Sequence, residues 1–272
     1  MEIYEFGQYL IKEAGEFVRS RMLEDFQVDS KLNPNDLVTD VDRETETFIY
    51  DRIHEMYPDH HIIGEEGHGT DIEDTSGVLW IVDPIDGTLN FVHQLQNFAI
   101  SIGVYIDGKP GCGLILDVMN DTLYRAEAGK GAYKDDVRLD SIGNTELATS
   151  LVSLNPNWVI KDRIGSAFAS VVEDARSTRS YGSAALDLAY TATGIVSATL
   201  FFRLHPWDYA AGMIIIDEVG GRTTNLLGEE IDILHKDSVL AANQSLHEEL
   251  VQYFAHDEAF IEAHRHVHGE KK

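Results

Sequence analysis

The sequence predicts a mixed α+β / α/β fold whose two halves follow different patterns. Near the N-terminus, apolar residues recur at three- and four-residue spacing, which is helical periodicity. Further on, Asp107 and Gly108 separate two apolar runs, a strong hairpin signal. Beyond about residue 145, strand-like and helix-like segments alternate. We therefore expect residues 1–144 and 145–272 to form two halves packed into one compact unit.

The first half should place two helices against a mostly antiparallel sheet. One helix is predicted over residues 3–25, and a polar loop follows it. Thr39 can cap a second helix, with Asp42 at the third helical position as the acid of a capping box. Strands are predicted near 60–64 and 78–83, and hairpins over 98–136.

In the second half, predicted strands alternate with predicted helices. Strands are predicted at 150–156, 197–202 and 238–244, and helices at 162–173, 183–193, 206–219 and 248–260. The end of the chain, residues 264–272, carries three alternating histidines. Such a tail could bind transition metals adventitiously, but we interpret it instead as a frayed, solvated terminus.

Charge and composition exclude several classes of partner. The 272 residues include 21 basic and 47 acidic side chains, a formal net charge of −26. Nucleic acids and anionic membrane surfaces are therefore excluded as partners, whereas cations are favoured. No stretch is long and apolar enough to span a bilayer, and the N-terminus lacks the pattern of a secretion signal. The single cysteine, Cys112, predicts a buried thiol and a reducing, cytoplasmic setting.

Three acidic clusters stand at the ends of predicted elements. Glu65 and Glu66 follow one strand, Asp83 and Asp86 end another, and Asp208 lies in the first turn of a helix. Each has an ordinary explanation by itself, because loop acids are common and an acid near a helix N-terminus complements the helix dipole. Their chemistry becomes informative only if they converge.

Asp83 and Asp86 are the hardest of these acids to explain as ordinary solvent-exposed side chains. Pro84 fixes the local backbone, so both carboxylates and the carbonyl of Ile85 can point to one side. These are the oxygen ligands that Mg²⁺ prefers. Gly87 then permits close backbone approach at a helix start, whose free N–H groups can bind an anion. A cation site beside a phosphate site is typical of metal-assisted phosphoryl transfer.

Five sequence blocks together closely resemble those of the inositol monophosphatase family. They are "NPNDLVTDVD" at 33–42, "GEEG" at 64–67, "WIVDPIDGTLNFVH" at 80–93, "RSYGSAALDLAYTATG" at 179–194 and "HPWDYAAG" at 205–212. The resemblance covers nearly the whole chain. It implies a layered αβαβα sandwich of the inositol monophosphatase / fructose-1,6-bisphosphatase type, usually a homodimer, with lithium-sensitive, Mg²⁺-dependent phosphatase activity.

The resemblance also implies a role for each matched residue. Two or three Mg²⁺ ions would be held by Glu65, Asp83, the carbonyl of Ile85, Asp86 and Asp208. Thr88, supported by Asp42 and together with Glu65, would orient the attacking water. Substrate contacts are implied for Asp86, Asp208, the amides of Gly87 and Thr88, the Gly182–Ser183–Ala184 turn, and Lys31 on a flexible loop.

One position departs from the pattern of inositol-specific members. They resemble one another in a glutamate seven residues before the "WD" aspartate, where this chain has Phe201. An aromatic ring cannot accept hydrogen bonds from inositol hydroxyls, so Phe201 argues against strict specificity for inositol phosphates. Arg203 could meet a second phosphate in a bidentate pair, or it could be exposed or paired with an acid.

The sequence therefore predicts a phosphomonoesterase that converts inositol 1-phosphate to inositol and phosphate. Within enzymes, the alternatives are NADP or fructose 1,6-bisphosphate as substrate. From other classes, they are a non-catalytic metal- or phosphate-binding regulator and an acidic structural protein. The presence of both Thr88 and Asp42 favours the enzyme, because a binding module needs neither to activate water.

Overall fold

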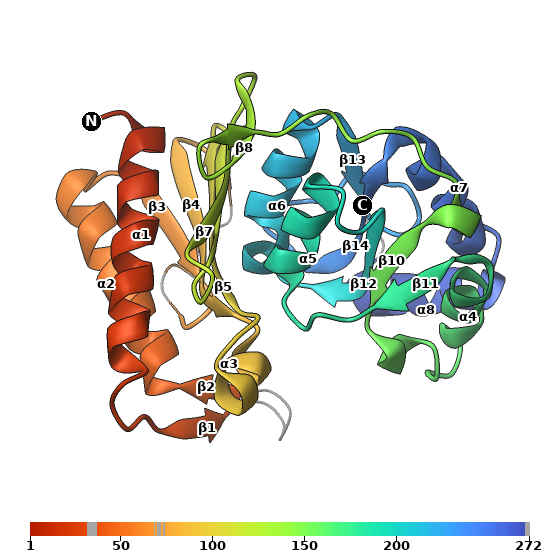
Figure 1. Ribbon diagram of the computed structural model, residues 1–272, viewed down its shortest axis with the longest axis horizontal. Helices are drawn as coiled ribbons and strands as arrows, with labels where there is room; N and C mark the ends of the chain where they lie inside the picture. Colours follow the sequence, from red (N-terminus) through yellow and green to blue (C-terminus); the bar gives the residue numbers. More distant parts are fainter. Residues whose placement is uncertain (32–36, 68, 70–71, 73, 270–272) are drawn as a thin grey trace.

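Five layers stack side by side in the order helices, sheet, helices, sheet, helices (Figure 1). The computed structural model describes residues 1–31, 37–67, 69, 72 and 74–269. The predicted layered αβαβα sandwich is confirmed. Of the matched block "NPNDLVTDVD" at 33–42, positions 33–36 lie outside the described residues.

The first layer contains α1 (Ile3–Arg21) and α2 (Asp40–Met56), which pack together on one face of the larger sheet. The predicted capping box of α2 is present, with the Thr39 hydroxyl accepting from the Asp42 amide and the Asp42 carboxylate accepting from the Thr39 amide. Two details differ from the prediction. Helix α1 ends before residue 25, and the expected polar loop contains an antiparallel pair, β1 (Val28–Ser30) with β2 (Leu37–Thr39).

The second layer is a seven-stranded sheet with its strands in sequence order. They are β3 (His61–Gly64), β4 (Val78–Asp86), β5 (Ala99–Ile106), β6 (Lys109–Asp117), β7 (Thr122–Glu127), β8 (Gly131–Lys134) and β9 (Val137–Arg138). Only the β3–β4 pair is parallel within this sheet, so the antiparallel prediction holds. Asp107 and Gly108 adopt φ values of 49° and 74°, the left-handed backbone that a tight hairpin turn requires.

The middle layer contains α5 (Ala184–Ala192) and α6 (Pro206–Glu218), which lie between the two sheets (Figure 1). A helix with a sheet on each side must be apolar all round, and α6 buries Tyr209, Ala210, Ile214, Ile215 and Ile216. This burial fixes the N-terminus of α6, and with it Asp208, relative to the end of β4.

The fourth layer is a five-stranded sheet in the order β11-β10-β12-β14-β13. Its strands are β10 (Leu151–Leu154), β11 (Ser177–Arg179), β12 (Ala198–Leu204), β13 (Gly221–Thr224) and β14 (Asp237–Asn243). The short strands β11 and β13 were not predicted. Strand β10 is parallel to β11 and β12, and β14 is antiparallel to β12 and β13.

The last layer covers the outer face of this sheet with α4 (Gly165–Asp174), α7 (Gln244–Ala255) and α8 (Glu258–His268). Short 3₁₀ helices occupy Leu147–Thr149 and Pro156–Trp158, and α3 (Thr88–Gln94) follows β4. Among the described residues, no helix combines the length and apolar character needed to cross a bilayer. Cys112 is buried on β6, as predicted.

The C-terminal segment corrects the sequence prediction. The expected single helix at 248–260 is two helices, because α7 ends at Ala255 and α8 begins at Glu258. Asp257 caps α8, and its carboxylate accepts a hydrogen bond from the Phe260 amide at 3.0 Å. The interpretation of residues 264–272 as frayed and solvated is wrong as far as residue 268, because α8 buries Phe260 and His264 against the sheet. Residues 270–272 lie outside the described part. The division of the chain at residue 144 stays a prediction.

Candidate active site

Three aspartates from two elements meet where the first sheet faces the middle helices. Asp83 and Asp86 end β4, and Asp208 lies in the first turn of α6; each offers an oxygen within 4.8 Å of the others. In a regular strand, residues three apart point to opposite faces. Here the β4–β5 register shifts between Asp83, opposite Ser101, and Asp86, opposite Ala99. This bulge, with one extra residue in β4, brings both carboxylates to the same side.

Burial makes these carboxylates unstable as isolated anions. Asp83 and Asp86 are 1% and 7% exposed. Burial raises the pKa of Asp86 to about 6, and it raises the pKa values of Asp83 and Asp208 well above their usual range. The neighbouring carboxylates raise them further. The group therefore favours a bound cation, whose charge would reverse this balance.

The start of α5 holds Asp86 in place. The hydroxyl of Ser183 donates to Oδ2, the Ala185 amide donates to the same oxygen at 2.8 Å, and the Ala184 amide donates to Oδ1 at 3.3 Å. These donors lower the pKa of Asp86 against the effect of burial. The predicted turn at 182–184 thus supports Asp86, and its contact with a substrate stays a prediction.

Local backbone bonds orient the other two aspartates. The Ile85 amide donates to Oδ1 of Asp83 at 3.0 Å, and the His205 amide donates to Oδ2 of Asp208 at 2.7 Å. Because each bond occupies one named oxygen of its carboxylate, the side-chain torsions are fixed before any ligand arrives. The three aspartates are therefore preorganised by three different elements.

Thr88 lies between a buried carboxylate and a backbone carbonyl. Its Oγ1 is 3.1 Å from Oδ1 of Asp42 and 3.1 Å from the carbonyl oxygen of Ile85. Asp42 is fully buried, and burial raises its pKa to about 6 although bonds from Thr39 oppose the rise. Above about pH 6 Asp42 is ionised and can only accept. The Thr88 proton is then directed inward, and its lone pairs remain available to a water molecule.

Two glycines and an asparagine bring α3 against the turn before α5. Gly87 has φ of 95°, and a Cβ atom there would lie 3.1 Å from the Gly182 carbonyl oxygen. The Asn90 amide donates to the carbonyls of Tyr181 and Asn97 at 2.7 and 2.8 Å. Sequence analysis missed Asn90, although it belongs to the quoted motif.

The glutamate pair lies beside the aspartates, and a single lysine forms ion pairs with both of its carboxylates. Lys31 Nζ is 3.0 Å from Oε1 of Glu65 and 2.6 Å from Oε1 of Glu66. Burial raises the pKa of Glu66 to about 7, and Lys31 opposes the rise. The charge of Glu65 contributes to the raised pKa of Asp83, which places Glu65 within electrostatic reach of the aspartates. The Glu66 amide donates to buried Glu46 at 2.6 Å, a partner that the sequence did not reveal.

Arg203 is not connected to the aspartates. It is exposed on β12 and forms no hydrogen bond or ion pair with the described residues. Phe201 packs against the core shared by α5 and α6, so it presents no polar group. The β12–β14 register shifts between Phe201 and Leu204, which moves Arg203 off the regular ladder.

Asp187 is a second site residue that sequence analysis missed. It is 2% exposed on α5 and accepts from the Ser153 hydroxyl at 2.9 Å. Burial raises its pKa to about 8, Ser153 opposes the rise and the charge of Asp86 adds to it. The available signal was an acid alone in the otherwise apolar segment "AALDLAYTA", one helical turn after Ser183.

Known proteins are similar to this chain in both sequence and architecture. The sequence profile of the inositol monophosphatase family matches residues 1–258. An inositol-1-monophosphatase of Bacillus subtilis (strain 168) is 47% identical over 257 residues, which cover 94% of this chain and 97% of that protein.

Solved structures agree with the sequence relatives. Inositol monophosphatase-II from Staphylococcus aureus MSSA476 superposes with a TM-score of 0.91 at 48% identity, covering 98% of each chain. A structure of SaIMPase-II with bound 2′AMP has a TM-score of 0.91 and 47% identity, covering 98% of this chain and all of that one.

Proposed function

The chain belongs to the inositol monophosphatase family, and we propose that it is a Mg²⁺-dependent phosphatase that hydrolyses inositol 1-phosphate to inositol and phosphate. The observation that carries this proposal is the convergence of Asp83, Asp86 and Asp208 within 4.8 Å. Thr88, hydrogen-bonded to Asp42, begins the helix that follows the first two aspartates.

The donor set fits Mg²⁺. The three aspartates offer only oxygen atoms, and burial with mutual repulsion raises their pKa values, so a hard cation would stabilise them. We assign as ligands the carboxylates of Glu65, Asp83, Asp86 and Asp208 and the carbonyl of Ile85, for two or three ions. Mg²⁺, when bound, activates water and neutralises charge on the phosphate.

The chain itself positions the nucleophile. Ionised Asp42 accepts a hydrogen bond from the Thr88 hydroxyl, so Oγ1 of Thr88 can in turn accept a hydrogen bond from the attacking water. This bond orients a lone pair of the water toward phosphorus. Glu65, close enough to raise the pKa of Asp83, is assigned to assist in removing the water's second proton.

The remaining predicted residues surround the substrate in this proposal. The amides of Gly87 and Thr88 bind phosphate oxygens at the start of α3, and the turn of Gly182, Ser183 and Ala184 contacts the alcohol. Lys31, which pairs with Glu65 in the structure, lies beside the same site.

The alternative substrate is a 2′-phosphorylated nucleotide such as NADP. Two observations favour this broader specificity: a relative 47% identical to this chain binds 2′AMP, and Phe201 packs into the core where inositol-specific members have a glutamate. Fructose 1,6-bisphosphate stays a third candidate. Exposed Arg203, free of partners among the described residues, is available for a second phosphate.

Phosphate release tests these proposals directly. Inositol 1-phosphate, NADP, fructose 1,6-bisphosphate and 3′-phosphoadenosine 5′-phosphate are each incubated with the protein, with Mg²⁺ and with chelator. We expect release from inositol 1-phosphate only with Mg²⁺, and inhibition by lithium. Release from none of the four would overturn the enzyme proposal in favour of a regulator that binds phosphate without turnover.

We also propose a cytoplasmic homodimer. The net charge of −26 supports a partner set without nucleic acid or membrane, and the single buried Cys112 supports a reducing setting. Analytical ultracentrifugation of the purified chain tests the dimer, and a monomer at micromolar concentration would contradict it.

A further inference from the structure

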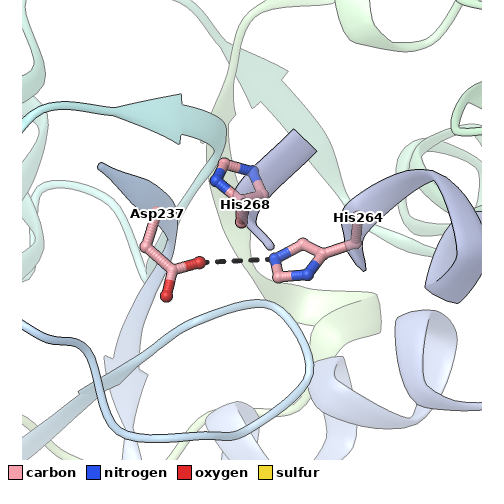
Figure 2. Close-up of side chains that lie close together, drawn as sticks. All are labelled: Asp237, His264 and His268. Atoms are coloured by element: carbon pink, nitrogen blue, oxygen red, sulfur yellow. Dashed lines mark ion pairs between the residues drawn. The ribbon is translucent and has the colours of Figure 1, made fainter. Parts of the chain in front are cut away.

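A second group of side chains of the kinds that ligate metals lies between β14 and α8. Asp237 begins β14, and His264 and His268 lie on α8 four residues apart, so both rings lie on one face of the helix. Figure 2 shows the three side chains gathered together. One donor atom from each lies within 4.8 Å of the others.

The protonation of His268 leaves one nitrogen free for a ligand. Its Nε2 lies 2.9 Å from the carbonyl oxygen of Phe202, which can only accept, so Nε2 carries the proton. Nδ1 is then the nitrogen with the lone pair. It is buried and has no hydrogen-bond partner within the described residues. A ring that donates one nitrogen to a backbone carbonyl and keeps the other for a metal is the usual arrangement of histidine ligands.

Burial and the neighbouring His264 ring lower the pKa of His268, whereas Asp237 and the carbonyls of Phe202 and Lys236 raise it. The geometry of the donor atoms, and not this shift, defines the site.

His264 and Asp237 already have the separation expected of two ligands on one ion. Nε2 of His264 is 3.4 Å from Oδ1 of Asp237 (Figure 2). Zinc bonds of about 2.0–2.1 Å in a tetrahedron place ligand atoms about 3.3–3.4 Å apart. The Ser238 hydroxyl also contacts Nε2 of His264 at 2.7 Å, so binding requires this hydroxyl to rotate away.

The cluster opens into a cavity large enough for an ion and its water. The cavity has a volume of about 320 Å³, and Asn225, Glu229 and Arg265 line it together with the cluster. The two carboxylates of Asp237 and Glu229 outnumber the single guanidinium of Arg265. Space therefore remains for water or Glu229 as a fourth ligand.

We propose that Asp237, His264 and His268 bind one divalent transition-metal ion, zinc in the first place, which clamps α8 to β14. Imidazole nitrogens favour zinc over magnesium, so this site differs in kind from the carboxylate site. It does not depend on the proposed function. Both histidines lie beyond residue 258, where the family match ends.

Zinc binding to variants tests the proposal. The full chain is titrated with Zn²⁺ against a chromogenic chelator, with Mg²⁺ in excess to occupy the carboxylate site. We expect one tightly bound Zn²⁺ per chain, and a loss of affinity of at least about 10-fold in His268→Gln. The matched control is His266→Gln, an exposed histidine of the same helix, which should bind as the unmodified chain does. Equal affinity in the unmodified chain and His268→Gln, or no binding in excess Mg²⁺, would overturn the proposal.

Two further measurements test the site, and the second needs no variant. Zn²⁺ should raise the thermal unfolding temperature of the unmodified chain and of His266→Gln, but not of His268→Gln. X-ray absorption of the unmodified chain carrying one Zn²⁺ should show two imidazole nitrogens. A shell of oxygen ligands alone would place the ion at the carboxylates and refute the site at α8.

Discussion

Burial acts in opposite directions on the aspartates at the end of β4 and on His268 of the α8 group, yet it favours the uncharged form in both places. Burial raises the pKa values of Asp83, Asp86 and Asp208, and it lowers the pKa of His268. In both places the uncharged form is favoured, because a low-dielectric surrounding disfavours charge. For aspartates the neutral form is a poor ligand, so a cation must compete with protons. For histidine the neutral form is the ligand itself.

This difference predicts different metals for the two places. The aspartate group is held by backbone amides and a serine hydroxyl, and it offers oxygen alone. The α8 group offers two imidazoles and one carboxylate. Hard Mg²⁺ suits the first and zinc the second. The following changes test that contrast and its consequences, from the largest expected effect to the smallest.

Asp83→Asn should have the largest effect. It removes a charged ligand from the centre of the aspartate group, so we expect kcat/KM with Mg²⁺ to fall by at least about 10³-fold, about 4 kcal/mol of transition-state stabilisation. Zinc binding at α8 in excess Mg²⁺ should not change. Phosphate release at saturating Mg²⁺ is the measurement, with Asp136→Asn, an exposed aspartate after β8, as control. Near-normal activity would remove Asp83 from the proposed ligands.

His247 tests the effect of burial on a histidine away from either group. It is 1% exposed, and its Nε2 contacts the Thr224 hydroxyl, which donates to the Asn225 carbonyl. Nδ1 has no hydrogen-bond partner in the described part of the chain. Burial, followed by Arg222, lowers its pKa to about 4 from 6.5. A lowered pKa means that its stabilising effect is complete above about pH 6.5 and is lost as the pH falls toward 4.

The effect of His247 on stability is measured against the His247→Gln variant. Unfolding free energies from urea titration are compared for the unmodified chain and His247→Gln at about pH 7.5 and about pH 4.5. The difference in unfolding free energy between the unmodified chain and the variant should shrink by about 2–3 kcal/mol at the lower pH. At that pH the unfolded chain binds a proton at histidine that the folded chain excludes, whereas glutamine does not titrate. A pH-independent difference would show that burial does not exclude the proton from this ring.

The same contrast shows what the sequence could predict. The aspartates lie in contiguous motifs, so Asp83, Asp86 and Asp208 were identified as a group. Pro84 was expected to turn Asp83 and Asp86 to one side, and the structure shows a β-bulge in the segment that contains this proline. The layered sandwich was implied by the family resemblance, and periodicity located most of the helices and strands. The short strands β1, β2, β9, β11 and β13 were missed.

The α8 group could not be predicted in the same way. Asp237 is separated from the histidines by an intervening helix, and alternating histidines near a chain end are typical of a solvated tail. Burial of Phe260 against the sheet decides that the segment folds back, and tertiary packing of this kind overrides local composition. Asn90 and Asp187 were missed because their partners are backbone and side-chain atoms far away in the sequence.

Thr88→Ala tests the water-positioning pair beside the aspartates. Removing the hydroxyl should lower kcat by about 10²-fold while Mg²⁺ binding persists, because positioning and proton transfer are lost but the ligands remain. Thr88→Ser keeps the bond to Asp42 and should recover most of the activity. Steady-state kinetics at saturating substrate decide between them. If alanine and serine variants are equally active, Thr88 does not orient the nucleophile.

Asn90→Ala should have the smallest effect, because it acts on the support of the site rather than on its ligands. It leaves the carbonyls of Tyr181 and Asn97 without the amide donor, which should cost about 1–2 kcal/mol of folding stability. The turn that follows Tyr181 carries the donors to Asp86, so kcat should fall by a few-fold as well. Gln94→Ala removes only the exposed residue that donates to Oδ1 of Asn90 and is the matched control. Thermal unfolding and kinetics measured together separate the two roles: lost stability with unchanged kcat would show that the turn keeps its place without Asn90.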